Sequence, residues 1–127
     1  MMICIICLFP FFFIGFATSA RDLARFGLLI YANGIWNGKA VVKDPGLLIE
    51  ALKPSKNMKP NYGFLWWLNN KNMYPDVPKD AVMALVSHSR ILAIIPSQKL
   101  VAVRIGNKAK GKVGKEFLNY FLLLWLI

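Results

Sequence analysis

Two apolar stretches joined by a short polar turn constrain the fold of this 127-residue chain more than any other feature. Residues 90–95 and 100–105 are each largely apolar, and Pro96-Ser97-Gln98-Lys99 between them is typical of a tight turn. This pattern predicts an antiparallel hairpin. Because the apolar residues run continuously instead of alternating with polar ones, we expect other elements to cover both faces of the hairpin.

A helix is predicted near the start of the chain, at residues 19–31. Its start is marked by Thr18 or Ser19, whose hydroxyl can accept a hydrogen bond from a free amide, and by Asp22, which suits the positive end of the helix dipole. The pair Asn33-Gly34 can adopt the left-handed conformation that ends a helix. The apolar residues at helical spacing, which we expect to be buried, are Leu23, Phe26, Leu29 and Ile30.

The remaining elements complete an α+β pattern. A short helix is predicted at residues 44–53, with Pro45 in its first turn, and strands are predicted at residues 62–68 and 81–86. One face of a last helix is formed by Val113, Phe117, Tyr120, Phe121 and Leu124. Helices beside an antiparallel sheet of about three strands indicate an α+β fold with flanking helices.

The N-terminal residues 1–17 differ from the rest, residues 18–127, which we treat as one domain. The apolar share of the chain is 57%, and residues 1–17 contain no charged or strongly polar residue. They have the length of a signal-peptide core, but the first positive charge is Arg21, and Pro10 interrupts any membrane span. A signal or anchor, which would place the protein in the periplasm, outside the cell or at a membrane, and an aberrant start both remain open.

The formal charge of +10 comes from 16 basic and 6 acidic residues. A window without any acidic residue contains six of the basic residues: Lys99, Arg104, Lys108, Lys110, Lys112 and Lys115. No aromatic residue interleaves them, so a solvated loop is favoured over a nucleic-acid site, and no nucleic-acid partner is expected. Cys4 and Cys7 fall in the apolar segment, with no second such pair and no nearby histidine to complete a metal site. If the segment is helical, the two lie one turn apart and behave as small apolar residues, so no metal or other cofactor is expected.

Four sequence blocks, taken together, resemble a known family. They are TSARDLARFGLL, NGIWNGK, YGFLWWLN and ILAIIPSQKLVAVRIGN, in this order. From about residue 17 to 127 the chain resembles the C-terminal part of the β-lactamase-related serine hydrolases, which include class C β-lactamases, DD-peptidases and esterase-like enzymes. The resemblance implies part of a β-lactamase/transpeptidase-like fold. It also implies a small-molecule amide or ester substrate, hydrolysed through a serine acyl-enzyme.

The resemblance further implies three catalytic elements: Ser-x-x-Lys, Tyr-x-Asn, and a Lys/His-Thr/Ser-Gly-like stretch on a sheet strand. No serine of this chain is followed three positions later by a lysine. Tyr31-Ala32-Asn33 has the composition of the second element, but it falls at the predicted end of the helix and downstream of where the family carries its catalytic triplet. We therefore assign no catalytic residue.

The third element would fall just before Arg90. There the chain has Ser87, His88 and Ser89, which we predict to be a remnant of a substrate-binding strand motif. Relatives usually have glycine in this stretch, whereas this chain has Val86 and Ser89, so a substrate could approach the backbone less closely. His88 is either a site residue or an ordinary polar residue at the end of a strand.

The sequence thus predicts a C-terminal fragment of a serine hydrolase that is inactive alone. The simplest explanation is a truncated or frameshifted gene product. The alternative is a small basic membrane-anchored protein without a catalytic role, held by residues 1–17. Carbonate washing of membranes distinguishes the two, because an anchored protein stays in the pellet.

Overall fold

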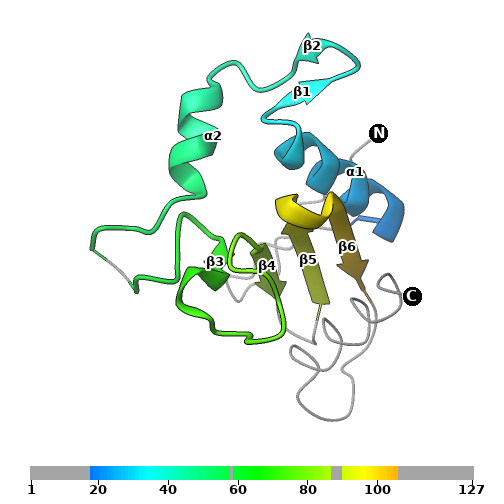
Figure 1. Ribbon diagram of the computed structural model, residues 1–127. Helices are drawn as coiled ribbons and strands as arrows, with labels where there is room; N and C mark the ends of the chain where they lie inside the picture. Colours follow the sequence, from blue (N-terminus) through cyan, green and yellow to red (C-terminus); the bar gives the residue numbers. More distant parts are fainter. Residues whose placement is uncertain (1–17, 58, 87–89, 106–127) are drawn as a thin grey trace, which may run out of the picture.

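The computed structural model describes residues 18–57, 59–86 and 90–105, which form two helices and two antiparallel sheets (Figure 1). The larger sheet has the strand order β3-β4-β5-β6, and a separate ribbon pairs β1 with β2. This arrangement confirms the predicted α+β class. In chain order the elements are α1 (Ala20–Tyr31), β1 (Ile35–Trp36), β2 (Lys39–Ala40), α2 (Pro45–Ala51), β3 (Trp67–Leu68), the 3-10 turn η1 (Asn69–Lys71), β4 (Val82–Val86), β5 (Arg90–Ile95), the 3-10 turn η3 (Pro96–Gln98) and β6 (Leu100–Arg104).

The predicted hairpin is confirmed as β5 and β6. Their register runs from Ile91 opposite Arg104 to Ile95 opposite Leu100. The η3 turn joins the two strands, and Lys99 leaves it in the left-handed conformation, with φ of 52°. From Ile91 to Ile95 every side chain of β5 is at most 3% exposed, so both faces of the strand are covered, as its continuous apolar sequence predicted.

Two apolar clusters lie on opposite faces of the large sheet. One cluster packs α1 and α2 against the sheet, and its buried members are Ile30, Trp66, Leu68, Leu92 and Ile94. The other cluster lies on the face reached by the segment between β3 and β4, and its buried members are Val77, Ala81, Met83, Ile91, Ala93, Ile95 and Ala102. Successive residues of β5 alternate between the two clusters, so this strand holds the two layers together.

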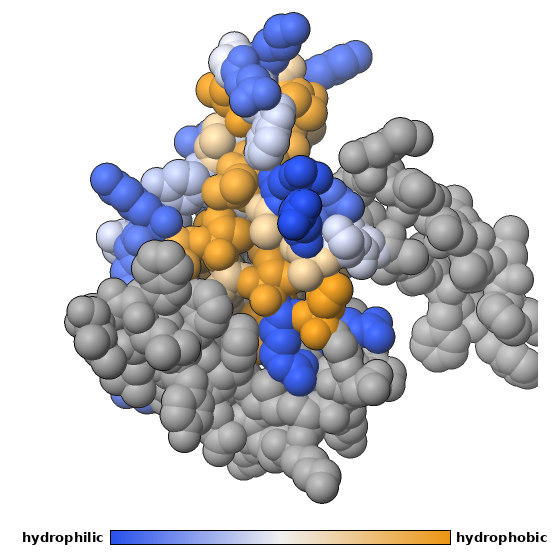
Figure 2. Space-filling model, turned by 90° about the vertical axis from the view of Figure 1, so that its right-hand side faces the viewer, coloured by the Kyte–Doolittle hydropathy of each residue, from blue (hydrophilic) through white to orange (hydrophobic). Residues whose placement is uncertain are grey.

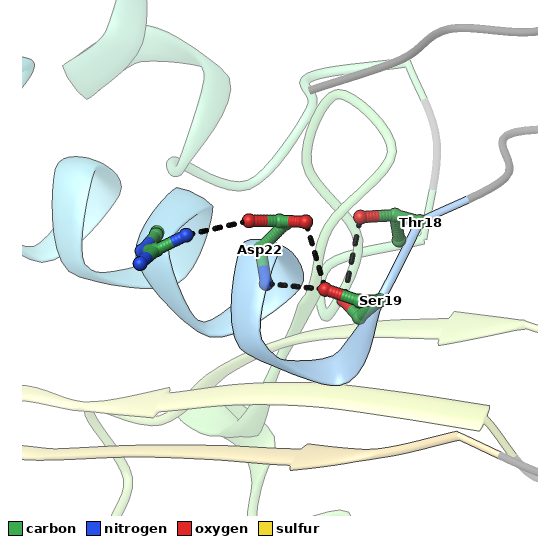
Figure 3. A network of polar contacts seen from close by, with 4 residues as sticks. Thr18, Ser19 and Asp22 are labelled. Carbon is green, nitrogen blue, oxygen red and sulfur yellow. Dashed lines mark hydrogen bonds and ion pairs between the residues drawn. The ribbon is translucent and has the colours of Figure 1, made fainter. Parts of the chain in front are cut away.

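Helix α1 begins at a hydrogen-bonded cap (Figure 3). The Asp22 amide donates to Ser19 Oγ over 3.1 Å, and the Ser19 hydroxyl donates back to Asp22 Oδ2 over 2.7 Å. Arg25 Nη1 donates to the other carboxylate oxygen, Asp22 Oδ1, over 2.8 Å. These hydrogen bonds, first from Ser19 and then from Arg25, lower the pKa of Asp22 because they stabilise its charged form.

We expect Ser19→Ala to lower the free energy of unfolding by about 1 kcal/mol at neutral pH, because the variant loses the cap of α1. A lowered carboxyl pKa stabilises the fold above the ordinary aspartate pKa, and this contribution disappears as the pH falls through the lowered value. The difference between wild type and variant should therefore shrink between neutral pH and about pH 3. Urea unfolding at both pH values measures it, and equal urea midpoints at neutral pH would contradict the capping role.

Helix α1 ends where the sequence predicted, and a short β-ribbon follows it. Asn33 and Gly34 have φ of 52° and 82°, and the Gly34 amide donates to the Leu29 carbonyl over 2.8 Å. Strands β1 and β2 then form a ribbon, whose turn at Asn37-Gly38 has φ of 49° and 73°. Positive φ at both turn residues is the geometry that Asn-Gly favours in two-residue hairpins.

The predicted strand at residues 62–68 is wrong over most of its length. Strand β3 comprises only Trp67–Leu68, and Tyr62 forms an isolated antiparallel bridge with Trp67. The Gly63 amide donates to the Trp66 carbonyl over 2.8 Å, so the chain folds back on itself in this stretch. The prediction of one continuous strand rested on β-propensity alone. Aromatic and aliphatic residues favour extended backbone whether or not a turn interrupts it, so propensity did not reveal the turn.

Strand β6 and helix α1 lie on the same side of the molecule, and Figure 2 shows apolar side chains gathered on this side. Among the described residues, β6 is an edge strand of the large sheet. Its Val101 and Val103 pack against the cluster under α1. The predicted last helix and the apolar segment 1–17 lie outside the described residues. In the part of the chain that is described, no helix has the length and apolar character needed to cross a membrane.

Candidate functional site

The predicted site residues Ser87, His88 and Ser89 lie outside the described residues, so their role stays a prediction. The structure does describe the two strand ends beside them. Strand β4 ends at Val86, which pairs with Arg90 at the start of β5, and the next residue, Ile91, pairs with Arg104 of β6. The backbones of Arg90 and Arg104 therefore lie at the end of the sheet where the chain passes from β4 to β5.

Among the described serines, Ser19 and Ser97 use their hydroxyl groups in hydrogen bonds within the fold. Ser19 caps α1 through Asp22. Ser97 donates its hydroxyl proton to Asp80 Oδ1 over 2.9 Å, and its amide donates to Asp80 Oδ2 over 2.6 Å, which ties η3 to the start of β4. A nucleophilic serine needs a base that removes its proton in the reaction. The hydrogen bonds of Ser19 and Ser97 instead serve the ends of a helix and a turn.

The triplet Tyr31-Ala32-Asn33 is the end of a helix, as the position of Gly34 predicted. Helix α1 has Tyr31 as its last residue and Ala32 as its C-cap. The Asn33 amide donates to the Ile30 carbonyl over 3.0 Å, and Tyr31 and Asn33 are both exposed. The triplet therefore lies at a helix end in this fold, and its exclusion from catalysis stays a prediction.

A buried polar centre that sequence reasoning missed lies at Asn69. This side chain is fully buried, and its Nδ2 donates to the carbonyls of Tyr74, Val77 and Pro78 over 3.0, 2.8 and 3.1 Å. Its Oδ1 accepts from the Tyr74 amide over 2.8 Å. All polar atoms of the side chain are thus used to hold the segment between β3 and β4, so Asn69 is a structural residue.

The described residues offer little further acid–base chemistry. Burial raises the pKa of Tyr74, whose phenol would be protonated at neutral pH even without this shift. Within residues 18–57, 59–86 and 90–105, no group of three histidine, cysteine, aspartate or glutamate side chains could hold a metal ion.

Comparison with known proteins identifies the fold. No family model and no curated protein match the sequence. Among solved structures, the chain is similar to one described as "Putative 6-aminohexanoate-dimer hydrolase from Bacillus anthracis", with a TM-score of 0.58 and 24% sequence identity. The match covers 85% of this chain and 28% of that protein, so this chain spans little more than a quarter of its length. The described fold is therefore similar to the fold of part of that protein, in agreement with the predicted α+β class.

Proposed function

We propose that this chain is a C-terminal portion of a β-lactamase-related serine hydrolase and does not hydrolyse amides or esters by itself. Two observations together support this proposal. The fold is similar to a hydrolase fold over 85% of this chain but only 28% of that hydrolase, and the sequence contains no Ser-x-x-Lys.

The absence of Ser-x-x-Lys bears on activity because this motif supplies the nucleophile of the reaction that the intact family would perform. A serine oxygen attacks the carbonyl carbon of the amide or ester, the leaving group departs, and water then releases the acyl group. This requires a base for the serine proton and amide donors for the oxyanion. Removal of the nucleophile from a serine hydrolase lowers kcat by roughly 10⁶-fold, so a chain without it has no measurable turnover of this kind.

Purified protein is expected to show no hydrolysis above the buffer rate with three substrates. These are the linear 6-aminohexanoate dimer, nitrocefin and a p-nitrophenyl ester, which present an amide, a β-lactam and an ester. A full-length hydrolase of the same fold, assayed alongside, shows that the conditions support the reaction. Turnover that grows with protein concentration and is stopped by a serine-directed inhibitor would contradict the proposal.

A further inference from the structure

A two-residue apolar tip, Phe64-Leu65, projects from the turn between Gly63 and Trp66. The Phe64 and Leu65 side chains are 67% and 81% exposed, and Leu65 is the most exposed large apolar residue described. Solvent-facing turns normally contain glycine, asparagine, aspartate or serine. Two large apolar side chains at the end of such a turn therefore need an explanation.

The backbone conformation of Leu65 is a second reason to look for a function of the tip. Its φ is 67°, in the left-handed region that a bulky side chain rarely adopts. The other described residues with positive φ are glycines, asparagines and one lysine: Asn33, Gly34, Asn37, Gly38, Asn72 and Lys99. Glycine at position 65 would fit the turn without strain, so a leucine at this position costs the fold stability.

The tip stands on a rigid base. Trp66, the residue after it, is 8% exposed and belongs to the cluster under α1 and α2. The Phe64 amide donates to the Ala51 carbonyl at the end of α2 over 3.1 Å. The rings of Tyr62 and Trp67, below the turn, meet edge to face with centroids 4.8 Å apart. The exposure of the tip is thus fixed by the packing beneath it.

Exposed lysines lie in the chain segments next to this base. The loop after α2 carries Lys53, Lys56 and Lys59, all exposed, and it contacts the base of the tip through two hydrogen bonds: the Ser55 amide to the Tyr62 carbonyl and the Tyr62 amide to the Lys59 carbonyl. Lys71, in η1, follows Asn70, whose side chain donates to the Pro60 carbonyl in the same loop. Glu50, at the end of α2, pairs with Lys53 over 2.6 Å. The local charge is therefore positive.

We propose that the Phe64-Leu65 tip inserts into an anionic lipid surface while the lysines of the neighbouring loop contact the lipid headgroups. Two projecting side chains offer far less area than a stable protein–protein interface buries, whereas a lipid surface needs no complementary groove. Basic residues near an anionic leaflet add to the attraction. The proposal does not depend on the hydrolase origin of the chain or on residues 1–17.

Sedimentation of the full chain with large unilamellar vesicles tests this. Vesicles of phosphatidylcholine with phosphatidylserine should bind the protein, and pure phosphatidylcholine should bind it more weakly. Leu65→Gly should lower the partition coefficient by about tenfold, because one large apolar side chain no longer enters the lipid. Its urea midpoint should stay at or above that of wild type, because glycine relieves the left-handed strain. Loss of binding therefore cannot be ascribed to unfolding.

Leu47→Ser is the matched control, since Leu47 on α2 is also an exposed leucine, at 69%. It should bind vesicles like wild type. Three results would overturn the proposal. The first is binding that Leu65→Gly leaves unchanged, which would place the lipid contact elsewhere in the chain. The second is an equal loss in both variants. The third is self-association that depends on Leu65 in the absence of any vesicle binding, which would make the tip a protein contact.

Discussion

Asn69→Asp is expected to lower the free energy of unfolding by about 3–5 kcal/mol, or to prevent folding altogether. The substitution keeps the shape of the side chain and the oxygen that accepts from the Tyr74 amide. It replaces the amide nitrogen, which donates to three backbone carbonyls, by an oxygen that cannot donate when ionised. A buried carboxylate would then face three acceptors without any compensating charge.

The pH dependence of this variant gives a second readout. Burial would raise the pKa of the new carboxyl group above its unfolded value of about 4. The folded state would then bind more protons than the unfolded state, so the variant should gain stability relative to wild type as the pH falls from neutral towards 4. Urea unfolding at several pH values measures this gain.

Asn70→Asp is the matched control for Asn69→Asp. Asn70 is the adjacent residue, but it is exposed and donates a single hydrogen bond, to the Pro60 carbonyl over 2.9 Å. Water can replace that bond, so we expect a loss of at most about 1 kcal/mol. Similar urea midpoints for the two variants would show that the buried amide of Asn69 does not organise the segment between β3 and β4.

Gly63→Ala is the other substitution with a large expected effect, a loss of about 3 kcal/mol in the free energy of unfolding. A Cβ atom at Gly63 would lie 2.5 Å from the Ala51 carbonyl oxygen and 2.7 Å from that of Lys53. Both are backbone atoms, one at the last residue of α2 and one just after it, so no rotamer change can relieve the clash. The turn would have to move away, and the hydrogen bond from the Phe64 amide to the Ala51 carbonyl would lengthen. Thermal unfolding followed by near-ultraviolet circular dichroism measures the loss.

Gly27→Ala provides the comparison for Gly63→Ala. A Cβ atom at Gly27 would come within 2.6 Å of Val101 Cγ1 and 2.8 Å of Leu92 Cδ1, distances like those at Gly63. These atoms are the ends of side chains, which can shift, and alanine favours the helix by about 1 kcal/mol over glycine. Gly27→Ala should therefore cost at most about 1 kcal/mol. A cost at Gly27 equal to that at Gly63 would mean that contact with the backbone of α2 is not what requires glycine at position 63.

Local signals in the sequence were enough to predict the elements whose ends are set by nearby residues. Ser19 and Asp22 mark the start of α1, and Asn33-Gly34 marks its end, because caps depend on hydrogen bonds a few residues apart. The apolar run that became β5 also predicted a strand covered on both faces, because continuous apolar runs are typical of strands that are buried on both sides. In β6 only Ala102 is fully buried, so the same expectation holds less well there.

Features that depend on distant contacts could not be predicted in the same way. The turn at Gly63–Trp66 exists because α2 lies against it, and the strand-like composition of residues 62–68 gives no sign of that contact. Asn69 likewise looks like an ordinary loop residue until three carbonyls from residues 74–78 surround it. For the candidate site, the sequence itself shows that Ser-x-x-Lys is absent. The role of Ser87, His88 and Ser89 stays a prediction.

Whether this chain can form an acyl-enzyme is decided by incubating it with a fluorescent penicillin and an activated ester, followed by intact-protein mass spectrometry. Because no serine of the sequence has a lysine three positions after it, we predict an unchanged mass, while a full-length hydrolase of the same fold gains one acyl group. The contradicting result is an added acyl group that peptide mapping places on one of the serines: Ser19, Ser55, Ser87, Ser89 or Ser97.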